Sequence, residues 1–143
     1  MKKGFTLMEL IIVVVIIGIL AMVGLPQFFR VAERGRAAEG IALLGSIRSA
    51  QLRFAAERGT TTGAMANLDI SDPTATLKFF GAPALVAGVD PQNNVGAIIA
   101  TVQRNGNQNQ AGNTYTLGIQ ANGIFTCDGG AANMCTLVRP QEN

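Results

Sequence analysis

The most hydrophobic part of the chain lies near its N-terminus. From Phe5 to Leu25 there are 21 residues, and Glu9 is the only charged residue among them. A helix of this length is roughly 31 Å long, about the thickness of the hydrocarbon core of a membrane. We therefore predict a membrane-spanning helix over residues 5–26. An ionised carboxylate costs about 2.5 to 3.5 kcal/mol at the membrane centre and less near the edge, so Glu9 needs a partner.

Glycine and proline interrupt the regular pattern of this helix. Gly18 and Gly24 have no side chain, while Pro26 has no backbone N–H and clashes with the preceding turn. We predict that the helix is kinked or loosened around Met22–Pro26. A bend at the membrane boundary is the simplest structural interpretation.

Residues 27–58 have an amphipathic pattern. Their apolar residues recur at spacings of three and four, which places them on one face of a helix. Gly59 is a typical stop signal. We predict one helix from Phe5 to about Arg58, whose second half packs against the rest of the chain. Its apolar face consists of Leu43, Ile47, Ala50 and Phe54, widened by Ile41, Leu44 and Leu52 and flanked by Arg48, Gln51 and Arg53.

Residues 59–94 form a connecting segment in this interpretation, because Gly, Pro, Asp and Thr turn signals are frequent there. Short ordered pieces are expected at Met65–Leu68 and Leu77–Phe80. The segment carries Asp69 and Asp72, which we expect to be solvated loop carboxylates rather than metal ligands.

The last third of the chain, residues 95–143, has the pattern of β-strands. Asn122-Gly123 is typical of a two-residue hairpin turn between two strands. We predict an α+β fold in which a three- to four-stranded antiparallel sheet covers the apolar face of the helix. The strands are expected at Val95–Gln103, Thr114–Gln120, Ile124–Cys127 and, as a fourth, Cys135–Val138, with Arg104–Asn113 as an exposed loop.

The residue types present disfavour an enzyme or a metal protein. The chain has no His, the residue that general acid–base and nucleophilic catalysis use most often. Cys127 and Cys135 do not have CxxC spacing, and no His can complete a zinc site. Asp128-Gly129-Gly130 and Asn133 supply too few carboxylates for a calcium loop. We predict no catalytic residues, no metal and no cofactor.

The charge balance does not indicate a nucleic-acid partner. There are 11 Lys and Arg residues against 9 Asp and Glu residues, and the excess consists of Lys2 and Lys3. A basic stripe for binding nucleic acid is therefore not expected. The arginines of the amphipathic helix are predicted to be a solvated face: Arg36, Arg48, Arg53 and Arg58.

The N-terminal residues Lys2-Lys3-Gly4-Phe5-Thr6-Leu7-Met8-Glu9, followed by the apolar span, resemble the processing site of a type IV prepilin. The resemblance covers roughly the first 58 residues strongly and the rest in outline. It implies that a membrane-embedded prepilin peptidase removes the leader, residues 1–4, by cutting after Gly4, and methylates the new amine of Phe5. It also implies a homopolymer: the subunit crosses the inner membrane once, and the pilus assembly machinery then incorporates it into an extracellular filament.

The same resemblance assigns roles to residues of the apolar helix. Glu9 would pair with the Phe5 amine, either within one chain or, as the family favours, with that of a neighbouring subunit. The segment from Gly18 to Pro26 would melt or stretch when subunits pack into a fibre, as an alternative to a simple bend.

The two cysteines close a nine-residue loop if they form a disulfide, as cysteines do in an oxidising compartment. Pilins often carry such a loop near the C-terminus, although usually a longer one. The alternative is a buried reduced pair of Cys127 and Cys135.

Several alternatives to a pilin remain open from the sequence. An ordinary signal peptide expects small residues at a cleavage site, which residues 21–24 match poorly. A plain single-pass membrane anchor is a second alternative. A type II secretion pseudopilin shares the processing site, and a minor tip pilin with a ligand-binding role shares the fold. The predicted function is a structural subunit of a type IV pilus, with adhesion, motility and DNA uptake open.

Overall fold

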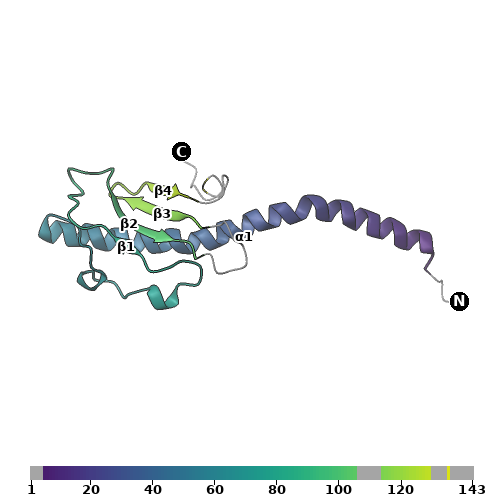
Figure 1. Cartoon of the computed structure of the whole chain (residues 1–143), viewed down its shortest axis with the longest axis horizontal. Coiled ribbons are helices and arrows are strands. Elements are labelled where there is room, and N and C mark those ends of the chain that lie inside the picture. The colour runs from purple at the N-terminus through teal and green to yellow at the C-terminus, as the bar shows by residue number, and fades with distance from the viewer. Residues whose placement is uncertain (1–4, 106–113, 130–134, 136–143) are drawn as a thin grey trace. The chain divides into compact units, whose positions relative to one another are not determined.

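The computed structural model describes residues 5–105, 114–129 and 135 (Figure 1). Its main helix, α1, spans Leu7–Arg58, 52 residues. The long helix expected from the sequence is thus confirmed. The chain divides into two compact units, residues 1–33 and residues 34–143. We call residues 34–143 the globular unit.

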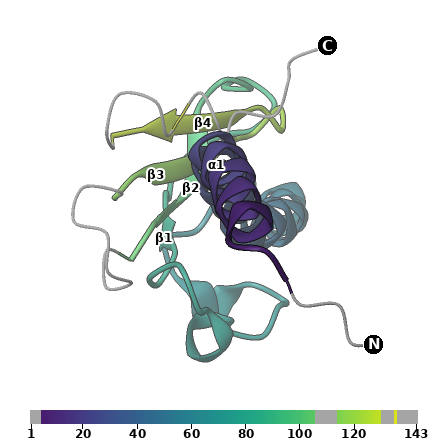
Figure 2. The same cartoon turned by 90° about the vertical axis from the view of Figure 1, so that its right-hand side faces the viewer.

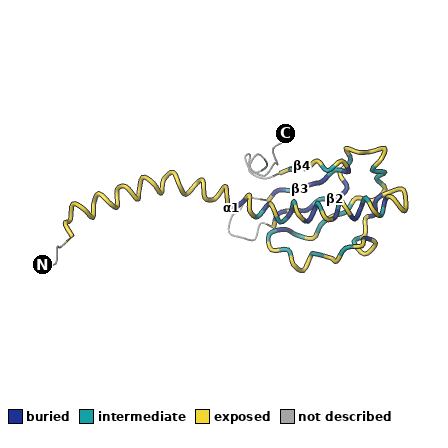
Figure 3. Tube along the Cα trace, turned by 180° about the vertical axis from the view of Figure 1, so that it is seen from behind, coloured by how far each residue is buried: buried dark blue, intermediate teal, exposed yellow. Residues whose placement is uncertain are grey.

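The first unit consists mainly of the apolar half of α1. Its large hydrophobic side chains are exposed along its length, from Phe5 to Val31 (Figure 3). By length and composition, α1 contains a stretch that can cross a membrane. Residues 22–26 are helical, with Pro26 inside the helix. Loosening of this segment on assembly stays a prediction.

The globular unit combines the second half of α1 with a four-stranded sheet (Figure 2). The strand order is β1-β2-β3-β4, and every neighbouring pair is antiparallel. The predicted α+β fold is confirmed. The strands are β1 (Ala84–Leu85), β2 (Ile98–Gln103), β3 (Thr116–Gln120) and β4 (Phe125–Asp128), and two short 3₁₀ helices are Met65–Asn67 and Thr74–Thr76.

The fourth strand does not come from where the sequence predicted it. It is β1, which lies inside the expected connecting segment and pairs Leu85 with Ala100 of β2. Two residues are too few to show strand periodicity, so the sequence gives no signal for it. Of the predicted strand Cys135–Val138, only Cys135 is described; residues 136–138 lie outside the described residues. Phe80, at the end of an expected ordered piece, forms an isolated antiparallel bridge with Arg104.

The loop between β3 and β4 is longer than the predicted two-residue turn. Gly123 N–H donates to Gln120 O and Gln120 N–H donates to Ile124 O, each at 2.9 Å, which leaves residues 121–123 in the loop. Ala121 N–H points to the other side of β3 and donates to Ala97 O, just before β2, at 3.0 Å. Gly123 has φ of 94°, the left-handed conformation in which three-residue hairpin loops end.

The core lies between α1 and one face of the sheet. Leu44 and Ile47 of α1 are fully buried, while the predicted Phe54 is only partly buried at the margin. Strand residues that point to this face alternate with outward ones, as expected for a half-covered sheet. The buried strand and loop residues facing α1 are Phe80, Ile99, Val102, Tyr115, Leu117 and Ile119.

A close approach of α1 to the core explains Gly40. A Cβ at this position would lie 2.8 Å from the ring of Phe80 and 3.0 Å from Leu117 Cδ1. Phe80 is fully buried and packs edge-to-face on Tyr115, with ring centroids 6.0 Å apart. Glycine therefore lets the helix contact the aromatic pair directly.

Polar side chains of α1 fix the connecting segment. Gln51 is fully buried, and its amide donates to Thr62 O at 2.7 Å and accepts from Thr62 N–H at 2.9 Å. Glu39 accepts from the backbone N–H groups of Lys78 and Phe79, both at 2.9 Å. Backbone groups that a loop would leave unpaired are thereby satisfied. The sequence had placed Gln51 only as a polar neighbour of the apolar stripe.

Candidate functional site

The N-terminus of α1 begins with a reciprocal pair of hydrogen bonds. Glu9 N–H donates to Thr6 Oγ1 at 3.2 Å, and Thr6 N–H donates to Glu9 Oε2 at 3.0 Å. The Thr6 hydroxyl also donates to Glu9 Oε2, at 2.8 Å. This is a capping box, in which the N-cap residue and the third helical residue satisfy each other's N–H groups. It explains why α1 begins at Leu7.

The capping box gives Glu9 a partner that sequence analysis missed. In the uncleaved chain Phe5 has a peptide nitrogen and no free amine, so its expected pairing with Glu9 stays a prediction. A carboxylate that accepts hydrogen bonds at a helix N-terminus is stabilised by them and by the helix dipole. The sequence does contain the signature of a capping box, because Thr6 and Glu9 form a Thr-x-x-Glu pattern directly before the apolar run.

The remaining predicted residues of the helix lie along the apolar unit. Phe5 is non-helical and strongly exposed, one residue before the N-cap. Gly18 has no atom near the position of an added Cβ, so its helix surface is open in the single chain. Gly4 lies outside the described residues. The structure therefore joins Thr6 to Glu9 by hydrogen bonds, with Phe5 next to Thr6 in the chain, and places Gly18 and Pro26 further along α1.

The structure joins Cys127 and Cys135 in a disulfide. Their Cα atoms are 5.5 Å apart, within the ordinary range for such a bond. Cys127 lies in β4 opposite Leu117, and both cysteines pack against the core. The alternative of a reduced pair is wrong for this structure.

We predict that the purified protein contains this bond. Intact-mass measurement should give a subunit lighter by two hydrogens before reduction than after it. Loop entropy assigns the bond about 2.5 kcal/mol of stability, so Cys127→Ser with Cys135→Ser should lower the unfolding temperature of the globular unit. Free thiols in secreted material would contradict this assignment.

The arginines of α1 are not a purely solvated face, which corrects the prediction. Arg53 donates from Nε and Nη2 to the two carboxylate oxygens of Asp69, each at 2.7 Å. Arg48 Nε donates to Ala121 O at 2.9 Å and so ties α1 to the β3–β4 loop. Arg36 and Arg58 lie over the rings of Phe79 and Phe54 at 5.5 and 5.9 Å.

The loop carboxylates also have partners within the chain. The hydrogen bonds from Arg53 hold the pKa of Asp69 below its ordinary value. Hydrogen bonds from the Thr74 side chain and backbone lower the pKa of Asp72 in the same way. Arg53 and Asp69 are both exposed, so their ion pair contributes little to the stability of the fold. Among the described residues, no three acidic or cysteine side chains gather as a metal site would require.

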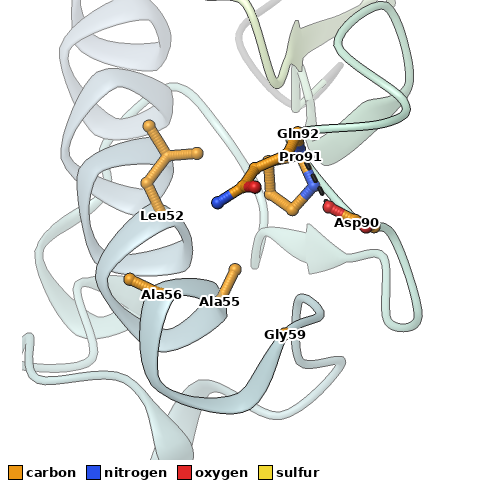
Figure 4. Close-up of a pocket in the computed structure, with 7 residues that line it drawn as sticks. All are labelled: Leu52, Ala55, Ala56, Gly59, Asp90, Pro91 and Gln92. Atoms are coloured by element: carbon orange, nitrogen blue, oxygen red, sulfur yellow. Dashed lines mark hydrogen bonds between the residues drawn. The ribbon is translucent and has the colours of Figure 1, made fainter.

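A hollow of about 260 Å³ lies between the last turns of α1 and the loop 90–92 (Figure 4). Asp90 is the one charged residue of its lining, and Asp90 Oδ1 accepts from Gln92 N–H at 2.9 Å. Its other oxygen, Oδ2, accepts from Asn93 Nδ2 at 2.6 Å. The hollow thus presents no set of converging acid and base groups for catalysis. Its lining consists of Leu52, Ala55, Ala56, Gly59, Asp90, Pro91 and Gln92.

A long apolar helix with a capped acidic start, continued into a disulfide-bonded antiparallel sheet, defines a pilin-like α+β fold. A comparison of the sequence with known protein families supports the same assignment. The family described as "Pilin (bacterial filament)" matches residues 34–141, and the prokaryotic N-terminal methylation motif matches residues 1–25. The chain belongs to the pilin family, a family of structural, non-enzymatic proteins, and is a structural subunit of a pilus.

Individual relatives carry pilin or fimbrial names. A fimbrial protein of Pseudomonas aeruginosa is 26% identical over 130 residues, 88% of this chain and 84% of that protein. The type IV major fimbrial protein FimA of Dichelobacter nodosus is 39% identical over 49% of this chain and 48% of its own length. The type IV major pilin protein PilA of Myxococcus xanthus is 43% identical over 40% of this chain and 26% of its own. No solved structure matches the chain.

Proposed function

We propose that this chain is made as a prepilin, cut between Gly4 and Phe5, methylated on Phe5 and polymerised through α1 into an extracellular type IV filament. The observation that carries the proposal is the N-terminus of α1. An exposed, non-helical Phe5 precedes a capped helix start, and the methylation motif matches this same region. Proteolysis requires an extended backbone, and the capping box leaves Phe5, on one side of the cut, outside the helix.

The apolar unit supports polymerisation through the helix. Its large hydrophobic side chains are exposed in the single chain, and such surface is stable only in lipid or against other apolar surface. Before assembly the inner membrane covers it. In the filament, helices of neighbouring copies cover it. The processing enzyme and the pilus assembly machinery are the partners that this route requires.

Glu9 sets the register between subunits in this proposal. Cleavage turns the Phe5 amide nitrogen into a cation, which methylation leaves protonated. Thr6 holds the Glu9 carboxylate at the helix start, where the Phe5 cation of the neighbouring copy pairs with it. An ion pair in a region of low dielectric is far more favourable than either ion alone.

Electron microscopy of material sheared from the cell surface tests the filament. We expect abundant long filaments, with this chain identified as their main component. Short or absent filaments, with the chain retained in the membrane, would favour the pseudopilin or a plain anchor. A few copies confined to filament tips would favour a minor pilin.

A further inference from the structure

The globular unit leaves one group of apolar side chains exposed. In its described part, the large apolar side chains that stay exposed are Val86, Val95, Ile98 and Ile124. Exposed apolar side chains are common singly, but a group of them at one place indicates an interaction surface.

Hydrogen bonds and strand register place three of these side chains at the same end of the sheet. Ile98 begins β2 and pairs with Gln120, the last residue of β3. Gln120 N–H donates to Ile124 O at 2.9 Å, and Asn122 N–H donates to Val95 O at 2.8 Å. We call Val95, Ile98 and Ile124 the apolar end of the sheet.

The opposite end of the same strands is polar. Gln103 ends β2 and pairs with Thr116, which in turn pairs with Asp128 of β4. Among the described residues of the sheet, the exposed large apolar side chains therefore lie at one end. If exposed apolar side chains ran along the whole length of the strands, they would instead indicate a binding face across the sheet.

The small area of the apolar end determines the kind of partner. A stable complex buries about 800 Å² on each partner, and three half-exposed aliphatic side chains supply only a fraction of that. A separate protein would not be held by this surface alone. A second copy of this chain is different, because packing through α1 already holds it at high effective concentration.

We propose that the apolar end packs against the globular unit of a neighbouring copy in the filament. The inference rests on the proposed function, since it requires the α1-mediated polymer. It adds a second contact between subunits, made by the sheet and independent of the apolar helix. The surroundings of the apolar end are polar: Gln120 and Asn122 are uncharged, and the Arg48 guanidinium lies beside the β3–β4 loop, where its Nε donates to Ala121 O at 2.9 Å.

Charge substitutions in the filament test the contact. Ile98→Lys and Ile124→Lys should lower filament yield about tenfold, which corresponds to ~1.4 kcal/mol per contact. They should also lower the temperature at which sheared filaments release subunits. Gln103→Lys is the matched control, since it adds the same charge at the polar end of the same strand. Wild-type levels of cleaved, disulfide-bonded subunit show that each variant folds.

A photo-crosslinking amino acid gives a readout that does not depend on yield. Benzoylphenylalanine at position 124, exposed on intact filaments to light, should give an adduct with twice the subunit mass that contains only this chain. The same group at position 103 should give much less. Absence of the adduct at 124, an adduct with another protein, or equal adducts at both positions would overturn the proposal.

The outcomes separate this inference from the proposed function. If the wild-type chain forms no filaments, the proposed function fails and the contact fails with it. If the wild type forms filaments and both lysine variants match it in yield and release temperature, only the sheet contact is wrong. If a lysine variant does not accumulate, the crosslink at 124 decides.

Discussion

Glu9→Gln lowers the yield of filaments at least about tenfold while the cleaved subunit accumulates in the membrane at the wild-type level. Glutamine keeps an oxygen that accepts the Thr6 N–H, as Glu9 Oε2 does at 3.0 Å, so α1 still begins at Leu7. The substitution therefore removes the charge and leaves the cap. Loss of the pair with the Phe5 cation of the neighbour accounts for the defect, and ~1.4 kcal/mol already corresponds to tenfold.

Quantifying sheared filaments against total subunit, with the cleaved form resolved from the precursor, measures this effect. Thr6→Ser is the matched control, because serine caps a helix as threonine does and the charge at position 9 is untouched. Normal filament yield from Glu9→Gln would show that the carboxylate serves only the helix start. A block in cleavage instead would assign Glu9 to recognition by the peptidase.

Ile47→Ala destabilises the globular unit by roughly 3 kcal/mol, because Ile47 is fully buried between α1 and the sheet. Removing its methyl groups leaves a cavity that close-packed neighbours fill only in part. For a unit of this size the loss lowers the unfolding temperature by more than about 10 °C. The full chain in detergent, with its disulfide intact, is the sample for thermal unfolding followed by circular dichroism.

Ile98→Ala provides the matched control for this measurement. It removes the same atoms from a side chain that is 39% exposed at the surface of the sheet. We expect a change within about 1 kcal/mol at Ile98. Equal destabilisation at the two positions would show that α1 and the sheet do not share the core described here.

Patterns within a single element could be predicted from sequence, and contacts between distant segments could not. The spacing of Leu43 and Ile47 depends only on helix periodicity, so the buried face was found before the structure. The hydrogen bonds between Gln51 and Thr62 depend on the path of the chain after α1. The sequence does not distinguish Gln51 from the other polar residues that flank the apolar face of α1. Glu39 is a similar case, since its partners Lys78 and Phe79 lie far along the chain.

At the candidate site, the acidic residue was predicted and its immediate partner was not. Charge in an apolar span makes Glu9 conspicuous, whereas Thr6 looks like any threonine until the helix start is known. The turn at Asn122-Gly123 was also found, but its length of three residues is set by the backbone bonds of Gln120 to Gly123 and Ile124, which the dipeptide alone does not specify.

The intact mass of the subunit purified from filaments tests the central claim most directly. The account predicts a subunit whose N-terminal residue is Phe5 with one added methyl group, and whose mass rises by two hydrogens on reduction of its disulfide. Fragmentation should place the methyl group on the amine of Phe5. A subunit that retains residues 1–4, or one that begins beyond the apolar span, would contradict it.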